Sequence, residues 1–140
     1  MKTLIKNIIL FATVSIMFNA CDLATEDAGP ANVYEKISGT WNISSMNMLG
    51  MDIPGDGSTL SFDNCDEPPC TGRDYEATDE TTGTFTYKFV EEDSKILIVD
   101  EDEKGGNYNA TWSILDFDKD YLKITGEFPI FGSMQMELRK

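Results

Sequence analysis

Few residue types in this chain can do chemistry, and the main ones are cysteine and the acidic residues. The 140 residues include 3 cysteines, 25 aspartates and glutamates, and no histidine. Without histidine the chain lacks the usual general base near neutral pH and the commonest transition-metal ligand. We therefore expect a protein that is not an enzyme and that uses neither a metal nor an organic cofactor.

Two of the cysteines, Cys65 and Cys70, enclose the short segment Asp66 to Pro69. Two thiols alone cannot complete a zinc site, and the spacing is not that of a redox C-x-x-C motif. In an exported protein we expect them to form a disulfide that stabilises the loop by roughly 2 kcal/mol. Free or metal-bound thiols are the alternatives.

The third cysteine, Cys21, follows a segment with the features of a secretory signal. Lys2 and Lys6 precede an apolar run from Ile8 to Phe18, which is shorter than the roughly 20 residues that span a bilayer. The residues from Phe18 to Cys21 resemble a bacterial lipobox. The resemblance implies that residues 1–20 are a lipoprotein signal peptide and that Cys21 becomes a lipidated N-terminus, held stably by two or more acyl chains.

Residues 21–31 have too little apolar content to fold, which predicts a flexible acidic tether of at most about 35 Å. An ordinary exported protein with a free cysteine is the alternative to lipidation. Asp22 after Cys21 resembles the inner-membrane retention signal of some Gram-negative bacteria, whereas in other groups an acidic start does not retain the protein. We expect a lipid-anchored protein of a Gram-negative cell envelope, with the outer membrane favoured.

The charge balance restricts the partners of the chain. Lys and Arg number 11 against 25 Asp and Glu, a net charge of −14 at pH 7. Such a charge repels nucleic-acid phosphates and anionic lipid alike, so we expect no nucleic-acid binding and a hydrophobic attachment to the membrane.

One acidic pattern is similar to a calcium-binding loop. Asp116, Asp118 and Asp120, with Glu127, match positions 1, 3, 5 and 12 of such a loop. However, Tyr121 stands where the loop needs glycine, and no helices flank the segment. A solvated hairpin turn is the better interpretation.

The elements that must position these residues are strands. Asn32, three residues before Glu35, predicts a capped helical turn through Ile37. From Thr40 onward apolar residues recur at every second position, which predicts an all-β domain over residues 32–140. We expect eight strands at Gly39 to Leu49, Ser58 to Asp63, Arg73 to Thr78, Gly83 to Glu91, Lys95 to Glu101, Asn107 to Asp116, Tyr121 to Phe128 and Phe131 to Arg139.

Short links between these runs predict sequential hairpins, which close most naturally into an eight-stranded antiparallel up-and-down barrel. A five- or six-stranded sandwich is the alternative. The segment from Ile96 to Val99 is apolar on both faces, so we expect the N-terminal turn to pack against its outside.

The glycine and tryptophan at Gly39 and Trp41, the eight predicted strands and the late basic residue Arg139 together resemble the lipocalins, specifically the compact lipocalin-like lipoproteins of Gram-negative envelopes. The resemblance implies that Trp41 closes the base of the barrel and that Arg139 packs across it. Because alternation turns Leu138 inward and Arg139 outward, that contact requires a bulge or a wrap at the strand end.

The resemblance also implies a small apolar ligand at the open end of a monomeric barrel. The side chains expected to line this pocket are Phe85, Tyr87, Tyr108, Trp112, Met134 and Met136. Met46, Met48 and Met51 would either join the pocket or fill the core.

The alternative is a filled barrel that serves as a structural or interaction lipoprotein. It would contact an envelope partner, or inhibit an exported protease, through the loop from Met51 to Gly57 and the disulfide loop. A cavity larger than about 300 Å³ favours ligand binding, and a packed interior favours the alternative.

Overall fold

The computed structural model describes residues 32–101, 107–130 and 132–140. The predicted signal peptide, the lipidated Cys21 and the tether at 21–31 lie outside these residues. Within them, no helix has both the length and the apolar character needed to cross a membrane.

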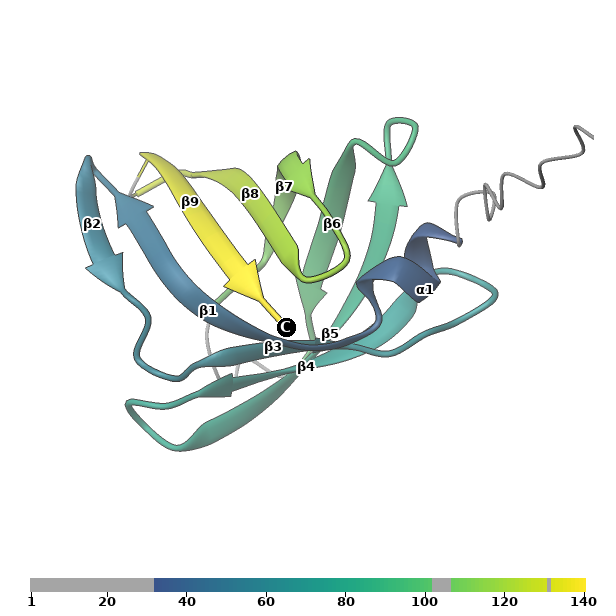
Figure 1. Ribbon diagram of the computed structural model, residues 1–140, viewed down its shortest axis with the longest axis horizontal. Coiled ribbons are helices and arrows are strands. Elements are labelled where there is room, and N and C mark those ends of the chain that lie inside the picture. Colours follow the sequence, from purple (N-terminus) through teal and green to yellow (C-terminus); the bar gives the residue numbers. More distant parts are fainter. Residues whose placement is uncertain (1–31, 102–106, 131) are drawn as a thin grey trace, which may run out of the picture. The chain divides into compact units, whose positions relative to one another are not determined.

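The described chain forms one short helix and a closed β-barrel (Figure 1). Every pair of neighbouring strands is antiparallel, and pairing of the first strand with the last closes the barrel. This confirms the predicted eight-stranded up-and-down barrel and excludes the sandwich. The elements are α1 (Val33–Ile37), β1 (Gly39–Met48), β2 (Met51–Pro54), β3 (Thr59–Phe62), β4 (Cys70–Glu76), β5 (Thr81–Val90), β6 (Lys95–Asp100), β7 (Ala110–Phe117), β8 (Tyr121–Phe128) and β9 (Gly132–Arg139).

The strand β2 lies in a segment that was predicted to be a loop. It pairs with β1 from Ser45 to Met48, and β3 pairs with the same edge of β1 from Gly39 to Asn42. The two short strands therefore occupy one barrel position, interrupted at residues 55–58. Leu49 and Gly50 make the tight turn into β2, with φ angles of 55° and 77°.

A bulge in β1 changes which residues face the interior. Trp41 and Ile43 are buried, but the register with β9 shifts between Ile43 and Ser45. Beyond this bulge the inward positions become the even ones, Met46 and Met48. Simple alternation along β1 would have turned these two methionines outward.

The helix α1 closes one end of the barrel, which we call the base. The indole nitrogen of Trp41 donates a hydrogen bond to the carbonyl of Ile37 at 2.6 Å, and both side chains are fully buried. The prediction that this turn covers the outside of β6 is wrong, because Ile37 belongs to the core and Val99 remains 41% exposed. Leu97 and Val99 instead border a surface hollow beside Pro69.

The predicted contact of Arg139 with Trp41 is also wrong. Leu138 points inward, so Arg139 points outward, and its guanidinium lies over the ring of Tyr121 at 4.9 Å. The cation over Trp41 is Lys140, whose ammonium lies 4.7 Å from the ring centre. The residue after the strand end is free to turn over the base, whereas one within the strand is not.

The predicted disulfide between Cys65 and Cys70 is confirmed, with Cα atoms 5.7 Å apart. Cys70 begins β4 and is buried in the core. Phe62, at the end of β3, pairs with Gly39, which begins β1 just after α1, and also with Gly72 near the start of β4. The disulfide loop, which joins β3 to β4, therefore lies at the same end of the barrel as α1. The opposite end, which carries the turn between β1 and β2, is called the mouth (Figure 1).

Candidate functional site

The side chains predicted to line a pocket lie together inside the barrel, but most of them border no open space. Phe85 and Tyr87 are each 1% exposed, and Trp112 and Met136 are 0% exposed. A side chain without accessible surface touches no cavity that could admit a water molecule. The prediction that these four line a ligand pocket is therefore wrong: they are core residues.

Aromatic rings fill this part of the barrel by packing against glycines. A Cβ atom on Gly72 would lie 2.3 Å from the ring of Phe85, and one on Gly126 would lie 3.0 Å from the indole of Trp112. Phe62 packs edge-on to Phe85, with ring centres 5.5 Å apart. The large rings thus use the space that the missing side chains leave on neighbouring strands.

Two buried tyrosines stay protonated in this core. Burial raises the pKa of Tyr87, whose hydroxyl donates a hydrogen bond to the carbonyl of Asp63 at 2.7 Å. Burial is also the main cause that raises the pKa of Tyr108, and the carboxylate of Glu76 raises it further. Both hydroxyls therefore stay protonated at physiological pH, and that of Tyr87 acts as a hydrogen-bond donor.

Toward the mouth the interior is lined by methionines. Met46 pairs with Met136 across β1 and β9, and Met48 pairs with Met134 on the same face. Met48 also pairs with Met51 of β2. Paired residues on one face have Cβ atoms about 5 Å apart, so these five residues form one surface, which we call the methionine cluster.

The methionine cluster runs from the core out to solvent. Met136 is fully buried, Met46, Met48 and Met134 are half-buried, and Met51 is 57% exposed. Of the six residues predicted to line a pocket, Met134 is the one whose side chain is half-buried at the mouth.

The barrel wall opens beside this cluster because β2 has a neighbour on one side alone. Among the described strands, β2 pairs with β1 and ends the sheet order, while β4 follows β3 and not β2. Ile53 of β2 pairs with Met46 and extends the apolar face to this edge. Ile53 was not predicted to belong to the site, although the tight turn at Leu49 and Gly50 followed by apolar residues two apart is a hairpin signal.

Apolar side chains also stand exposed at the tips of the mouth. Leu49 is 68% exposed and Ile130 is 85% exposed. Leu49 follows the residue that pairs with Met134, and Ile130 lies in the turn between β8 and β9. These tips stand beside the methionine cluster at the mouth.

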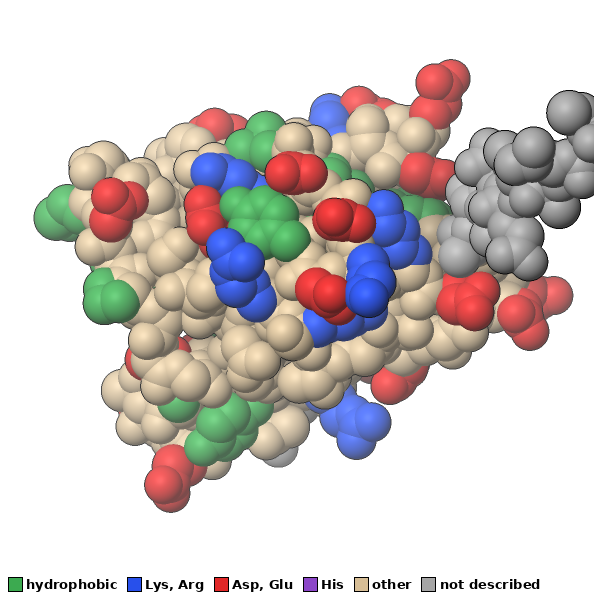
Figure 2. Space-filling view, in the orientation of Figure 1, with side chains coloured by type: hydrophobic (Ala, Val, Ile, Leu, Met, Phe, Trp, Pro, Cys, Tyr) green, Lys and Arg blue, Asp and Glu red, His purple; other side chains and the backbone are tan. Residues whose placement is uncertain are grey.

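An acidic side chain, Asp56, lies between β2 and β3. Asp56 accepts hydrogen bonds from the amide of Ser58 and the hydroxyl of Thr78, at 2.9 and 3.1 Å. The bonds with Ser58, and then that from Thr78, hold the pKa of Asp56 below its usual value, so the carboxylate stays charged. Figure 2 shows acidic side chains spread over one face of the molecule, with basic ones gathered among them near its middle.

The acidic pattern at Asp116 does not converge on one point. Asp116 lies near the end of β7, whereas Glu127 lies near the far end of β8. In the described part of the chain, no three carboxylate or cysteine side chains are grouped so that they could hold a metal ion.

Comparison with protein-family models gives no match, and neither curated proteins nor solved structures yield one.

Proposed function

We propose that the protein is a lipid-anchored, lipocalin-like lipoprotein of the bacterial cell envelope that binds one small apolar group at its mouth. The observation that carries the proposal is the methionine cluster, which passes from the packed core to solvent where the wall opens at β2. Methionine is flexible and polarizable, which suits a surface that adapts to apolar ligands. The packed aromatic core then serves as a rigid scaffold and not as a container.

The position of α1 fits a lipid anchor at Cys21. The described chain begins beside this helix, and the helix closes the base through the bond between Trp41 and Ile37. A tether over residues 21–31 would join the described chain at its base, the end of the barrel opposite the mouth. The anchor is tested by mass spectrometry of the protein from its own envelope, where an acyl mass on Cys21 is expected and Cys21→Ala removes it.

The binding site is tested with N-phenyl-1-naphthylamine, a neutral probe that fluoresces in apolar surroundings. We expect saturable binding at one site per chain. Met134→Gln and Met48→Gln are each expected to weaken it about fivefold, since each removes roughly 1 kcal/mol of apolar contact. Leu115→Gln is the matched control, because Leu115 is 52% exposed on the outside of β7.

Energy transfer locates the bound probe within the barrel. Trp112 pairs with Gly126, which pairs with Met134, so this indole is in register with the methionine cluster. Trp41 lies at the base. The probe is expected to quench Trp112 in a Trp41→Phe variant more strongly than it quenches Trp41 in a Trp112→Phe variant. Equal quenching of both, or no binding, would refute the proposal.

A protein partner is the second candidate, in which the barrel is a structural or interaction lipoprotein. The packed interior at Phe85, Tyr87 and Trp112 favours this function, and the exposed tips at Leu49 and Ile130 offer apolar side chains on which a partner can dock. If the neutral probe does not bind, loss of partner association in Leu49→Asp with Ile130→Asp would support this function instead.

A further inference from the structure

The outer face of the barrel carries a row of polar side chains that crosses five adjacent strands. Each member pairs with the next across a strand boundary: Asn47 with Gln135, Gln135 with Thr125, Thr125 with Ser113, and Ser113 with Lys95. All five are half-buried. At about 4.8 Å between strands, the row is about 19 Å long.

Two surface hollows follow this row and meet at Thr125. One, of about 310 Å³, also includes Leu49, and the other, of about 400 Å³, reaches Lys95. We call the two together the polar groove. Its polar lining includes Asn47, Gln135, Ser133, Thr125, Ser113 and Lys95.

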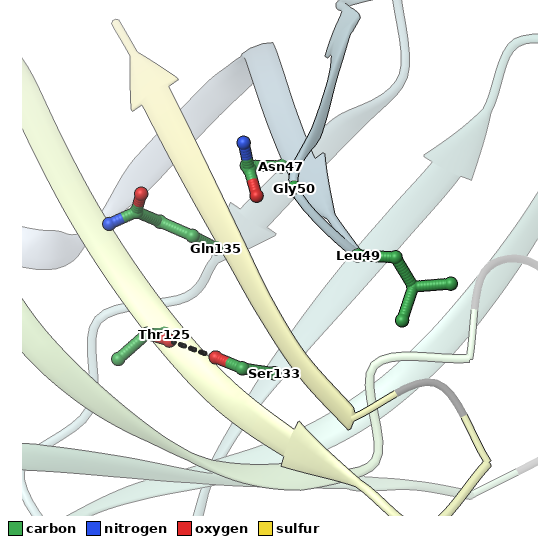
Figure 3. A pocket seen from close by; sticks show the side chains of 6 residues that line it. All are labelled: Asn47, Leu49, Gly50, Thr125, Ser133 and Gln135. Atoms are coloured by element: carbon green, nitrogen blue, oxygen red, sulfur yellow. Dashed lines mark hydrogen bonds between the residues drawn. The ribbon is translucent and has the colours of Figure 1, made fainter.

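The groups in the groove can both donate and accept hydrogen bonds. Figure 3 shows Thr125 and Ser133 bonded to each other, with Asn47 and Gln135 on the neighbouring strands β1 and β9. Within the described chain, the side chains of Gln135 and Ser113 make no hydrogen bond, so their donors and acceptors are available to a ligand.

The groove is also unusual in charge. The protein carries 25 acidic residues, yet the residues that line the groove include a single one, Glu127, and a single cation, Lys95. Beside the groove, the carboxylate of Asp52 accepts a hydrogen bond from the Asn47 amide at 2.6 Å. Lys95 already forms an ion pair with Glu91 at 2.7 Å. Amides and hydroxyls without net charge match an uncharged polar ligand rather than an anion or a cation.

We propose that the polar groove binds an uncharged oligosaccharide lying across the strands. The amide of Gln135 offers a donor and an acceptor side by side, and the Asn47 amide, which donates to Asp52, still offers its oxygen; these groups match neighbouring hydroxyls of a sugar. A pyranose unit is about as long as one strand spacing. The row follows the curved wall of the barrel, and each hollow spans two strand spacings, so each fits about two sugars on either side of Thr125. Leu49, exposed at one end, contacts the apolar face of the terminal ring. This site is separate from the methionine cluster, which faces the inside of the barrel.

The test uses NMR titration of the protein with two neutral probes, cellotetraose and chitotetraose. We expect one of them to shift the side-chain amide signals of Asn47 and Gln135 together with the backbone signals of Ser113 and Thr125. Gln135→Ala and Ser113→Ala are each expected to weaken binding about fivefold through a lost hydrogen bond. Having both variants keeps the test valid if one of them fails to fold.

Asn109→Ala is the matched control, because Asn109 is an exposed amide outside the groove. It should leave the titration unchanged, as should Met134→Gln, which separates this site from the proposed mouth site. Three results would overturn the proposal: no shift with either probe at millimolar concentration, shifts outside the groove, or tighter binding of an acidic oligosaccharide such as tetragalacturonate.

Discussion

Replacing Gly72 with alanine tests whether the barrel is full at the place where a pocket was expected. The new Cβ would lie 2.3 Å from Phe85 and 2.7 Å from the carbonyl oxygen of Ser61. Ordinary contact begins at 3.4 Å, so the Phe85 ring must retreat by about 1 Å, and Phe62 packs against it. Overpacking of this kind costs about 1–3 kcal/mol, and the loss of backbone freedom in the unfolded chain offsets about 0.4–1 kcal/mol.

The assay is urea unfolding followed by tryptophan fluorescence, with Phe85→Leu and the double variant Gly72→Ala/Phe85→Leu measured beside the single one. We expect Gly72→Ala to lower the free energy of unfolding by roughly 1–2 kcal/mol, and the melting temperature by about 4–8 °C for each kcal/mol. The loss in free energy of unfolding should be smaller in the double variant than the two single losses added together, by at least about 0.5 kcal/mol, because the smaller Leu side chain makes room for the new Cβ.

An additive double variant would refute this reasoning. It would mean that the strain comes from the Ser61 carbonyl, which Phe85→Leu leaves in place, and not from a tightly packed Phe85 ring. Gly126→Ala is the graded comparison, because its Cβ would approach Trp112 no closer than 3.0 Å. Gly126→Ala should lower the free energy of unfolding by less than Gly72→Ala does.

Two further predictions concern the outer surface and the base. A hydrogen bond from Lys123 lowers the pKa of Glu137, so Glu137 stabilises the fold above its ordinary pKa of 4.5, and this contribution is lost as the pH falls through the lowered value. Below about pH 4.5 the free energy of unfolding should therefore fall less steeply with decreasing pH in Glu137→Gln than in the wild-type protein. Lys140→Met should change the fluorescence emission of Trp41, because its ammonium lies 4.7 Å from the ring, whereas Arg139→Met should not. The reverse result would restore Arg139 as the residue that covers the indole.

Regular alternation explains why most of the barrel could be predicted. Strand β5 carries Phe85, Tyr87 and Phe89 at every second position, and all three are buried. Strand β2 was missed because Pro54 and Gly55 end it after four residues, a composition more typical of a loop. Short strands gain their stability from the neighbour they pair with, and that neighbour cannot be read from the local segment.

The candidate site was predicted less well than the fold. Met134 and Met136 were expected at a pocket, and they do lie on the inner face beside Met46 and Met48. Their pairing with β1 depends on the bulge at Ser44, which shifts the inward positions by one residue. No feature of the sequence near Ser44 indicates where that bulge falls.

The sequence alone determined the all-β class, the number of barrel strands and the cysteine pair, because these follow from spacing along the chain. Tertiary structure alone decided that the aromatic core is packed, because whether Phe85 meets a void or a neighbour depends on Gly72 of another strand. It also decided that Lys140 rather than Arg139 covers Trp41. In each of these cases the outcome depends on contacts between residues distant in sequence, whose distances are fixed when the strands pair.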